Sequence, residues 1–155
     1  MKGIYFIENR CVGCEECMVA CEKAHEGQSR AYVTMAGGFF PFPMQCRHCQ
    51  DAPCKAVCPA DALQRNEHGA IVADTEKCIG CGTCASVCPF GVLRLNPNTG
   101  KILKCDLCFE RLADGLEPAC VTACPKGAIL FGEIEDQQAT RREKLAGYVK
   151  SSLGF

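Results

Sequence analysis

Short apolar runs separated by turn residues are the main pattern along this chain. The run Gly-Ile-Tyr-Phe-Ile at residues 3–7 predicts a first β-strand, and residues 128–131 predict a last one. Between them, residues 62–73 and 91–104 each contain two apolar runs around a polar turn, which predicts two β-hairpins. The pattern therefore predicts several short strands.

Helical periodicity is limited to short segments and to the end of the chain. Residues 18–24 predict a short helix, and Glu110-Arg111-Leu112 before Gly115 predicts another. Residues 135–150 predict an amphipathic helix whose apolar face carries Leu145, Tyr148 and Val149. This helix would cap the domain or contact another subunit.

The longest stretch without cysteine, residues 22–45, carries adjacent glycines at 37–38 and prolines at 41 and 43. These residues predict an irregular segment. Its Phe39 to Met44 run would form an apolar docking surface or cover neighbouring metal sites. We favour the covering role, because such sites must exclude water with whatever apolar residues the chain has.

Composition changes the picture, because the core would be thin. The chain has 155 residues, enough for one domain or two fused small ones. Its hydrophobic fraction of 48% includes 16 cysteines, and there is no Trp. Disulfides or metal must therefore supplement apolar burial.

The N-terminal sequence and the charge favour metal and a protein partner. Residues 1–10 show no signal-peptide pattern, and no apolar run has the length of a membrane-spanning helix. We therefore expect a cytoplasmic protein without membrane insertion, in which thiols stay reduced and bind metal. The net charge of -1 gives no indication of nucleic-acid binding.

The most specific motif is Cys78-x2-Cys81-x2-Cys84-x3-Cys88-Pro89. This spacing binds 4Fe–4S clusters in bacterial-type ferredoxins, where the fourth cysteine ligates the neighbouring cluster. Glycines within the loop let backbone N–H groups approach the cluster sulfurs, and the proline ends the helix that follows.

Three further cysteine groups repeat this pattern with variations. The first keeps the spacing without the proline, the second widens the loop by two residues, and the fourth delivers its third cysteine late. Their members are Cys11, Cys14, Cys17 and Cys21; Cys46, Cys49, Cys54 and Cys58; and Cys105, Cys108, Cys120 and Cys124. Sixteen cysteines in four groups predict four 4Fe–4S clusters. Zinc is disfavoured, because its sites use two separated C-x2-C pairs. His48 lies between two cysteines and would donate a hydrogen bond to a cluster, tune its potential or face solvent.

These motifs resemble the four-cluster ferredoxin-type electron-transfer subunits found with molybdenum and tungsten oxidoreductases. That family includes the small iron–sulfur subunits of formate dehydrogenase, formate hydrogenlyase, dimethyl-sulfoxide reductase and carbon monoxide dehydrogenase systems. The most specific matches are Cys46-Arg-His-Cys49 with Cys54 and Cys58-Pro59, and Cys105-Asp-Leu-Cys108 with Cys120 and Cys124-Pro125.

The resemblance implies ligand sets that cross between groups. Cluster 1 would be held by Cys11, Cys14, Cys17 and Cys124, and cluster 2 by Cys46, Cys49, Cys54 and Cys88. Cluster 3 would be held by Cys78, Cys81, Cys84 and Cys58, and cluster 4 by Cys105, Cys108, Cys120 and Cys21.

The resemblance also implies an α+β fold of two fused bacterial-type dicluster ferredoxin units with short strands, cluster loops and short helices. Within a four-cluster domain at 1–132, the outer unit would comprise residues 1–25 and 101–132, and the inner unit residues 44–95. Residues 133–155 would form a C-terminal helical tail.

The function indicated is a non-catalytic relay of single electrons. It would connect a catalytic subunit, such as a tungsten or molybdenum aldehyde or formate oxidoreductase, a carbon monoxide dehydrogenase or a hydrogenase, with a further redox partner. The alternatives are a freely diffusing polyferredoxin and a protein that stacks into a conducting filament. A catalytic role is disfavoured, because each group has its full four cysteines and leaves no open iron site.

Overall fold

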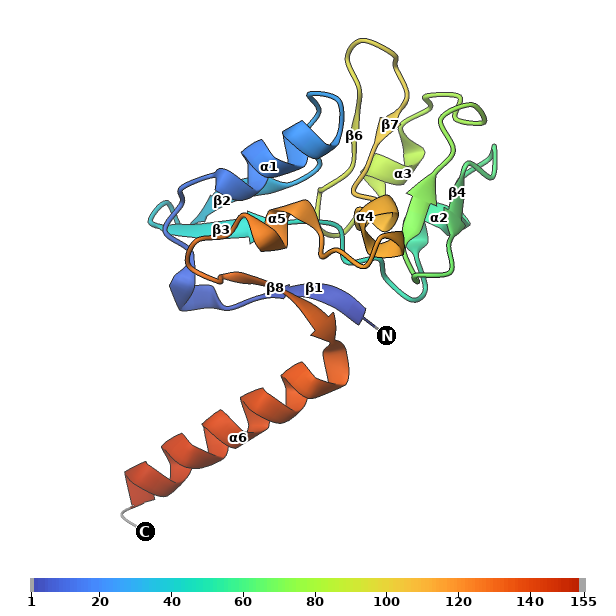
Figure 1. The fold of residues 1–155 in the computed structure, drawn as a ribbon. Helices are drawn as coiled ribbons and strands as arrows, with labels where there is room; N and C mark the ends of the chain where they lie inside the picture. The colour runs from blue at the N-terminus through green and yellow to red at the C-terminus, as the bar shows by residue number, and fades with distance from the viewer. Residues whose placement is uncertain (1, 154–155) are drawn as a thin grey trace.

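The computed structural model describes residues 2–153 and has the predicted α+β class. The first and last strands pair: β1 (Lys2–Phe6) runs antiparallel to β8 (Ile129–Glu133), with Ile4 opposite Phe131 (Figure 1). Both strands were expected from sequence, within one or two residues. Their pairing brings the segment before the first cysteine group next to the segment after the fourth.

The two predicted hairpins are also present. Each is a two-stranded antiparallel sheet of two or three residues per strand. The strands are β4 (Leu63–Arg65), β5 (Ile71–Ala73), β6 (Arg94–Leu95) and β7 (Ile102–Leu103). Such short pairs are marginal in isolation, so their stability depends on packing against the rest of the chain.

The prediction of an irregular segment at residues 22–45 is wrong for its second half. Strands β2 (Tyr32–Ala36) and β3 (Phe40–Met44) form an antiparallel hairpin around the glycine turn. Pro41 faces Met35 and Pro43 faces Val33. Because the two prolines are two residues apart, both missing N–H groups fall on the same edge of β3, and the ladder to β2 can form.

Four short helices each carry the third cysteine of one group, and a fifth helix, between Cys108 and Cys120, contains no cysteine. The helices are α1 (Glu16–Ala24), α2 (Pro53–Ala56), α3 (Thr83–Ser86), α4 (Phe109–Ala113) and α5 (Ala119–Thr122), with a 3₁₀ turn η1 at Glu8–Arg10. Proline follows the last cysteine of the second, third and fourth groups and stops α2, α3 and α5 after one turn. The first group has Glu22 instead, and α1 continues to Ala24 as predicted.

Two apolar clusters hold these elements together. The larger surrounds Leu63, Ile71 and Ile102, and the smaller surrounds Ile129 and Val121. Cysteines contribute to both clusters. Cysteines are therefore part of the apolar core, whereas the need for metal to supplement that core and the boundaries of the outer and inner units stay predictions.

Helix α6 (Ile134–Leu153) follows β8 directly and extends away from the body of the molecule (Figure 1). It confirms the predicted C-terminal helix and is longer than expected. The side chains of Leu145, Tyr148 and Val149 are all exposed. Residues 1, 154 and 155 of the predicted units lie outside the described residues. Across residues 2–153, the structure contains no helix with the length and apolar character needed to cross a bilayer.

Candidate metal centres

Three cavities are each lined by four cysteines that come from two different groups. We name them site 1, lined by Cys11, Cys14, Cys17 and Cys124; site 2, lined by Cys46, Cys49, Cys54 and Cys88; and site 3, lined by Cys58, Cys78, Cys81 and Cys84. Their empty volumes, including the openings to solvent, are about 320, 310 and 340 Å³. Equal donor sets and similar volumes indicate that the three sites suit the same kind of group.

The remaining four cysteines form site 4, comprising Cys21, Cys105, Cys108 and Cys120, all of which are buried. Burial, followed by the charges of Cys105, Cys108 and Cys21, raises the pKa of Cys120 well above the ordinary thiol value. These four side chains therefore share one low-dielectric environment. A thiol in such a place ionises only with a cation beside it, as in metal ligation.

The residue before the second cysteine has the same left-handed backbone at every site. It is Gly13 at site 1 and Gly80 at site 3, with φ of 73° and 71°. At sites 2 and 4 the same position holds His48 and Leu107, with φ of 46° and 65°. A non-glycine residue there is strained, so the side chains of His48 and Leu107 are expected to offset that strain through contacts at sites 2 and 4.

Backbone N–H groups donate to cysteine sulfurs at all four sites. Ala128 N donates to Cys124 Sγ at 3.2 Å, and Ala62 N donates to Cys58 Sγ at 3.3 Å. Further bonds run from His48 N to Cys46 at 3.4 Å, Ile102 N to Cys78 at 3.4 Å, Arg30 N to Cys21 at 3.2 Å and Leu107 N to Cys105 at 3.4 Å. Such donors favour the thiolate form that metal binding requires.

The effect of these donors is visible at Cys124. Burial alone would raise the pKa of this thiol, but N–H groups of the loop at residues 126–129 lower it overall. Burial raises the pKa of Cys17, on the other side of site 1, to about 11. At site 1, the backbone around Cys124 therefore favours the thiolate, whereas the apolar surroundings of Cys17 favour the neutral thiol.

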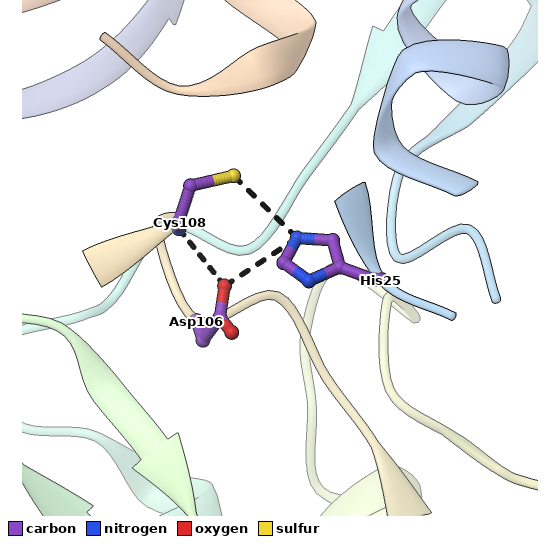
Figure 2. Close-up of side chains that lie close together, drawn as sticks. All are labelled: His25, Asp106 and Cys108. Atoms are coloured by element: carbon purple, nitrogen blue, oxygen red, sulfur yellow. Dashed lines mark hydrogen bonds and ion pairs between the residues drawn. The ribbon is translucent and has the colours of Figure 1, made fainter. Parts of the chain in front are cut away.

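His25, Asp106 and Cys108 lie together at the edge of site 4 (Figure 2). His25 Nε2 lies 3.5 Å from Cys108 Sγ and 3.7 Å from Asp106 Oδ1. Asp106 also accepts a hydrogen bond from Cys108 N at 2.8 Å and pairs with Arg30. Because Cys108 belongs to site 4, we interpret the trio as the polar wall of that site. It does not form a separate metal centre.

His48 is buried, so the alternative in which it faces solvent is wrong. Its Nδ1 accepts a hydrogen bond from Ile71 N at 2.9 Å. The hydrogen of the neutral ring is therefore on Nε2, which is buried without a protein partner among the described residues. Burial, then the charges of Lys104 and Arg65, lowers the pKa of His48 to about 3. His48 lines the site-2 cavity, and an unpaired donor there fits a group with acceptor sulfides.

Sequence reasoning missed Lys104 and His25. Lys104 is buried, and its Nζ donates to Cys46 Sγ at 3.1 Å. The only signal in the sequence is a lysine directly before Cys105 in an apolar run. His25 follows α1 and has no signal of its own, because its approach to Cys108 spans more than eighty positions.

The sites differ in exposure. Cys14 at site 1 and Cys81 at site 3 are exposed, and so are the preceding apolar residues Val12 and Ile79. Site 4 has only buried cysteines, and site 2 has two buried and two half-buried ones. Sites 1 and 3 are therefore the ones with an exposed cysteine.

The apolar segment 39–44 only partly follows its prediction. Pro43 is buried and lines site 1, and Phe42 packs edge-on against Phe6 with ring centroids 4.2 Å apart. The preferred covering role is wrong for Phe39 and Phe40, which are 83% and 73% exposed at the hairpin tip. Adjacent exposed aromatic side chains are typical of a contact surface.

Two family models match this chain. A 4Fe-4S dicluster domain matches residues 38–134, and a 4Fe-4S binding domain matches residues 8–24. The matched ranges include all of the cysteines of the four groups.

Similar proteins include subunits of bacterial reductases and a bacterial ferredoxin-like protein. The thiosulfate reductase electron transfer subunit PhsB of Salmonella typhi is 42% identical over 147 residues, covering 86% of this chain and 77% of that protein. YnfG of Escherichia coli (strain K12), a probable anaerobic dimethyl sulfoxide reductase chain, is 35% identical over 152 residues, covering 86% and 74%. The ferredoxin-like protein YdhX of Escherichia coli O157:H7 is 40% identical over 143 residues, covering 84% and 64%.

Proposed function

Because this chain belongs to the family of 4Fe-4S dicluster proteins, we propose that it relays single electrons through four 4Fe–4S clusters, one at each site. The proposed ligands are the four cysteines of each site, and each bound cluster would accept and release one electron at a time. The observation that carries the proposal is the convergence of sixteen cysteines into four sets of four.

We infer the order 1, 4, 2, 3 for the proposed clusters from the cysteines that lie near one another. Cys17 of site 1 acts electrostatically on Cys120 of site 4, and Cys46 of site 2 acts on Cys105 of site 4. Cys54 of site 2 acts on Cys84 of site 3. Each site is thus adjacent to the next, which supports a path with its exposed ends at sites 1 and 3.

Buried apolar side chains lie in the middle of this proposed path. Leu107 and Ile71, both fully buried, pack beside sites 4 and 2. The N–H donors to cysteine sulfurs stabilise negative charge without needing to move, which lowers the reorganisation that each transfer requires.

The partner at one end would be a catalytic oxidoreductase subunit, as the relatives' names indicate for those proteins. The substrate of that subunit, whether thiosulfate, a sulfoxide, formate or an aldehyde, depends on the partner. The exposed Phe39 and Phe40 lie on the hairpin that packs against the site-1 loop, since a Cβ at Gly13 would lie 3.1 Å from Pro41. We propose this hairpin tip as the contact of one partner and the Ile79 end as the contact of the other.

The test is to purify the tagged protein anaerobically from its native host and to measure iron, mass by light scattering, and bound proteins. We expect iron for four clusters and a fixed complex with an oxidoreductase. A monomer would support a diffusing carrier, and a ladder of sizes would support a filament; either would overturn the subunit assignment.

Matched variants separate the two ends. Replacing Phe39 and Phe40 with serine should release one partner and keep the iron content, whereas Ile79→Ser should release the other. Loss of both partners in both variants would contradict the assignment of separate ends.

A further inference from the structure

The ammonium group of Lys104 is buried between sites 2 and 4. Besides Cys46 Sγ, its Nζ donates to the carbonyl oxygens of Ile71 at 2.5 Å and Cys105 at 2.9 Å. Three acceptors satisfy the three donors of an ammonium. In the described part of the chain no carboxylate forms an ion pair with it. A buried cation without a carboxylate is costly unless another negative group lies beside it. A Cys46 sulfur bound to the proposed site-2 cluster would be that group.

Two arginines add positive charge around site 2. Arg47 lines its cavity and lies over the rings of Phe6 and Phe90, at 4.8 and 5.9 Å. Arg65 donates to the carbonyl oxygens of Cys49 and Gln50 at 2.6 and 2.9 Å, within the ligand loop. Asp51, the acidic residue of that loop, is exposed to solvent, where its charge is screened.

Site 4 has charges of both signs near its sulfurs, because Lys104 and Asp106 both act on Cys105. The charge of Asp106 acts on Cys105 and Cys108, and its carboxylate lies at the edge of the site. Arg30 pairs with that carboxylate and offsets its charge. Lys104 reaches site 4 through the backbone carbonyl of Cys105, whereas at site 2 it contacts a sulfur directly.

We propose that Lys104 gives site 2 the highest reduction potential of the four sites, so that an electron entering the path comes to rest there. The inference rests on the proposed four-cluster function. Each transfer removes one electron from a site and adds it to the next, with no other reactant. Lys104 stabilises the added negative charge at site 2 by Coulomb attraction in a poorly screened environment. His48 lines the same site, and its Nε2–H, which has no protein partner among the described residues, is a further donor that would stabilise added negative charge there.

The experiment is an anaerobic redox titration of the full-length protein followed by electron paramagnetic resonance. Wild type is compared with Lys104→Met, Lys104→Gln and Lys101→Met, and iron and sulfide are measured for each. Lys101 is the matched control, because it lies on the same hairpin and its Nζ bonds only the carbonyl of Cys78 among the described residues. The site-2 signal is identified as the one that Cys88→Ala removes or alters.

We expect the site-2 signal to have the highest potential in wild type. Lys104→Met should lower its reduction equilibrium constant at least tenfold, which is about 59 mV for one electron. The signals of sites 1 and 3 should stay unchanged, and Lys101→Met should leave the site-2 signal in place.

Different failures have different meanings. Iron for fewer than four clusters would contradict the proposed function itself. Four clusters with site 2 below another site, or a site-2 signal that Lys104→Met and Lys104→Gln do not move, would overturn only this inference. If neither Lys104 variant binds its clusters, the inference is still tested by whether site 2 has the highest reduction potential in the wild-type protein.

Discussion

The two central sites and the two end sites use one loop geometry with different side chains. The left-handed position before the second cysteine holds glycine at sites 1 and 3 but His48 and Leu107 at sites 2 and 4. Those two side chains are only 7% and 2% exposed. The strain of a left-handed non-glycine residue is about 1–2 kcal/mol. Burying a leucine contributes about 1.5–3 kcal/mol, which offsets it. At sites 2 and 4, the free energy gained by burying a side chain over the site thus offsets the backbone strain, whereas sites 1 and 3 use glycine and have neither the strain nor the cover.

The largest contrast is expected from removing one cysteine at a central site and one at an end. Cys120→Ser should leave buried polar groups and an incomplete site in the core, costing about 4 kcal/mol or more and preventing soluble folding. Cys14→Ser, at an exposed position, should keep the fold and alter one cluster. Soluble yield, circular dichroism and iron content measure both. Equal yields would break the comparison.

The second-largest effect is expected from replacing Cys88, which would remove the cluster of site 2 although the residue is close in sequence to the cysteines of site 3. Cys88 follows Cys84 in sequence but lines site 2. Cys88→Ala should therefore damage the site-2 cluster and leave that of Cys78, Cys81 and Cys84, as judged by electron paramagnetic resonance. Loss of the site-3 signal alone would show that the ligands do not cross.

The covering role of Leu107 predicts a smaller effect on stability. Leu107→Ala should cost about 2–5 kcal/mol and speed the oxidative loss of cluster absorbance. Val12→Ala, at an exposed position beside site 1, is the control and should change little. Measured unfolding free energies that are equal for the two variants would contradict the distinction between covered and open sites.

The smallest effect is expected from replacing either of two glycines in the site-3 loop with alanine. Gly80 and Gly82 both have left-handed φ, but a Cβ at Gly80 would collide with the carbonyl oxygen of Gly100, whereas one at Gly82 would lie 3.9 Å from Leu95. Gly82→Ala should cost about 1 kcal/mol from strain alone, and Gly80→Ala more, because the backbone must move. Thermal release of iron compares them. If Gly82→Ala released iron at a lower temperature than Gly80→Ala, the turn at residue 100 would be able to move away from the new Cβ at little cost.

Local sequence predicted much of the fold because its signals act over a few residues. Proline after Cys58, Cys88 and Cys124 stops each helix, and a turn-rich segment between apolar runs makes each short hairpin. The β2–β3 hairpin was missed because the same residues, Pro41 and Pro43, are counted as strand breakers. Only their spacing, seen against the partner strand, shows that they leave the ladder intact.

The candidate sites divide in the same way. Cysteine spacing by itself predicted 4Fe–4S clusters and four groups of cysteine ligands, since the geometry of a cluster loop is encoded within about a dozen positions. The ligand sets that cross between groups came from the family resemblance. The tertiary structure alone decided which cysteines are buried, that Phe39 and Phe40 point to solvent, and that Lys104 lies against Cys46. Those properties depend on contacts between residues far apart in the sequence. Their strength depends on burial and local dielectric, which no local pattern specifies.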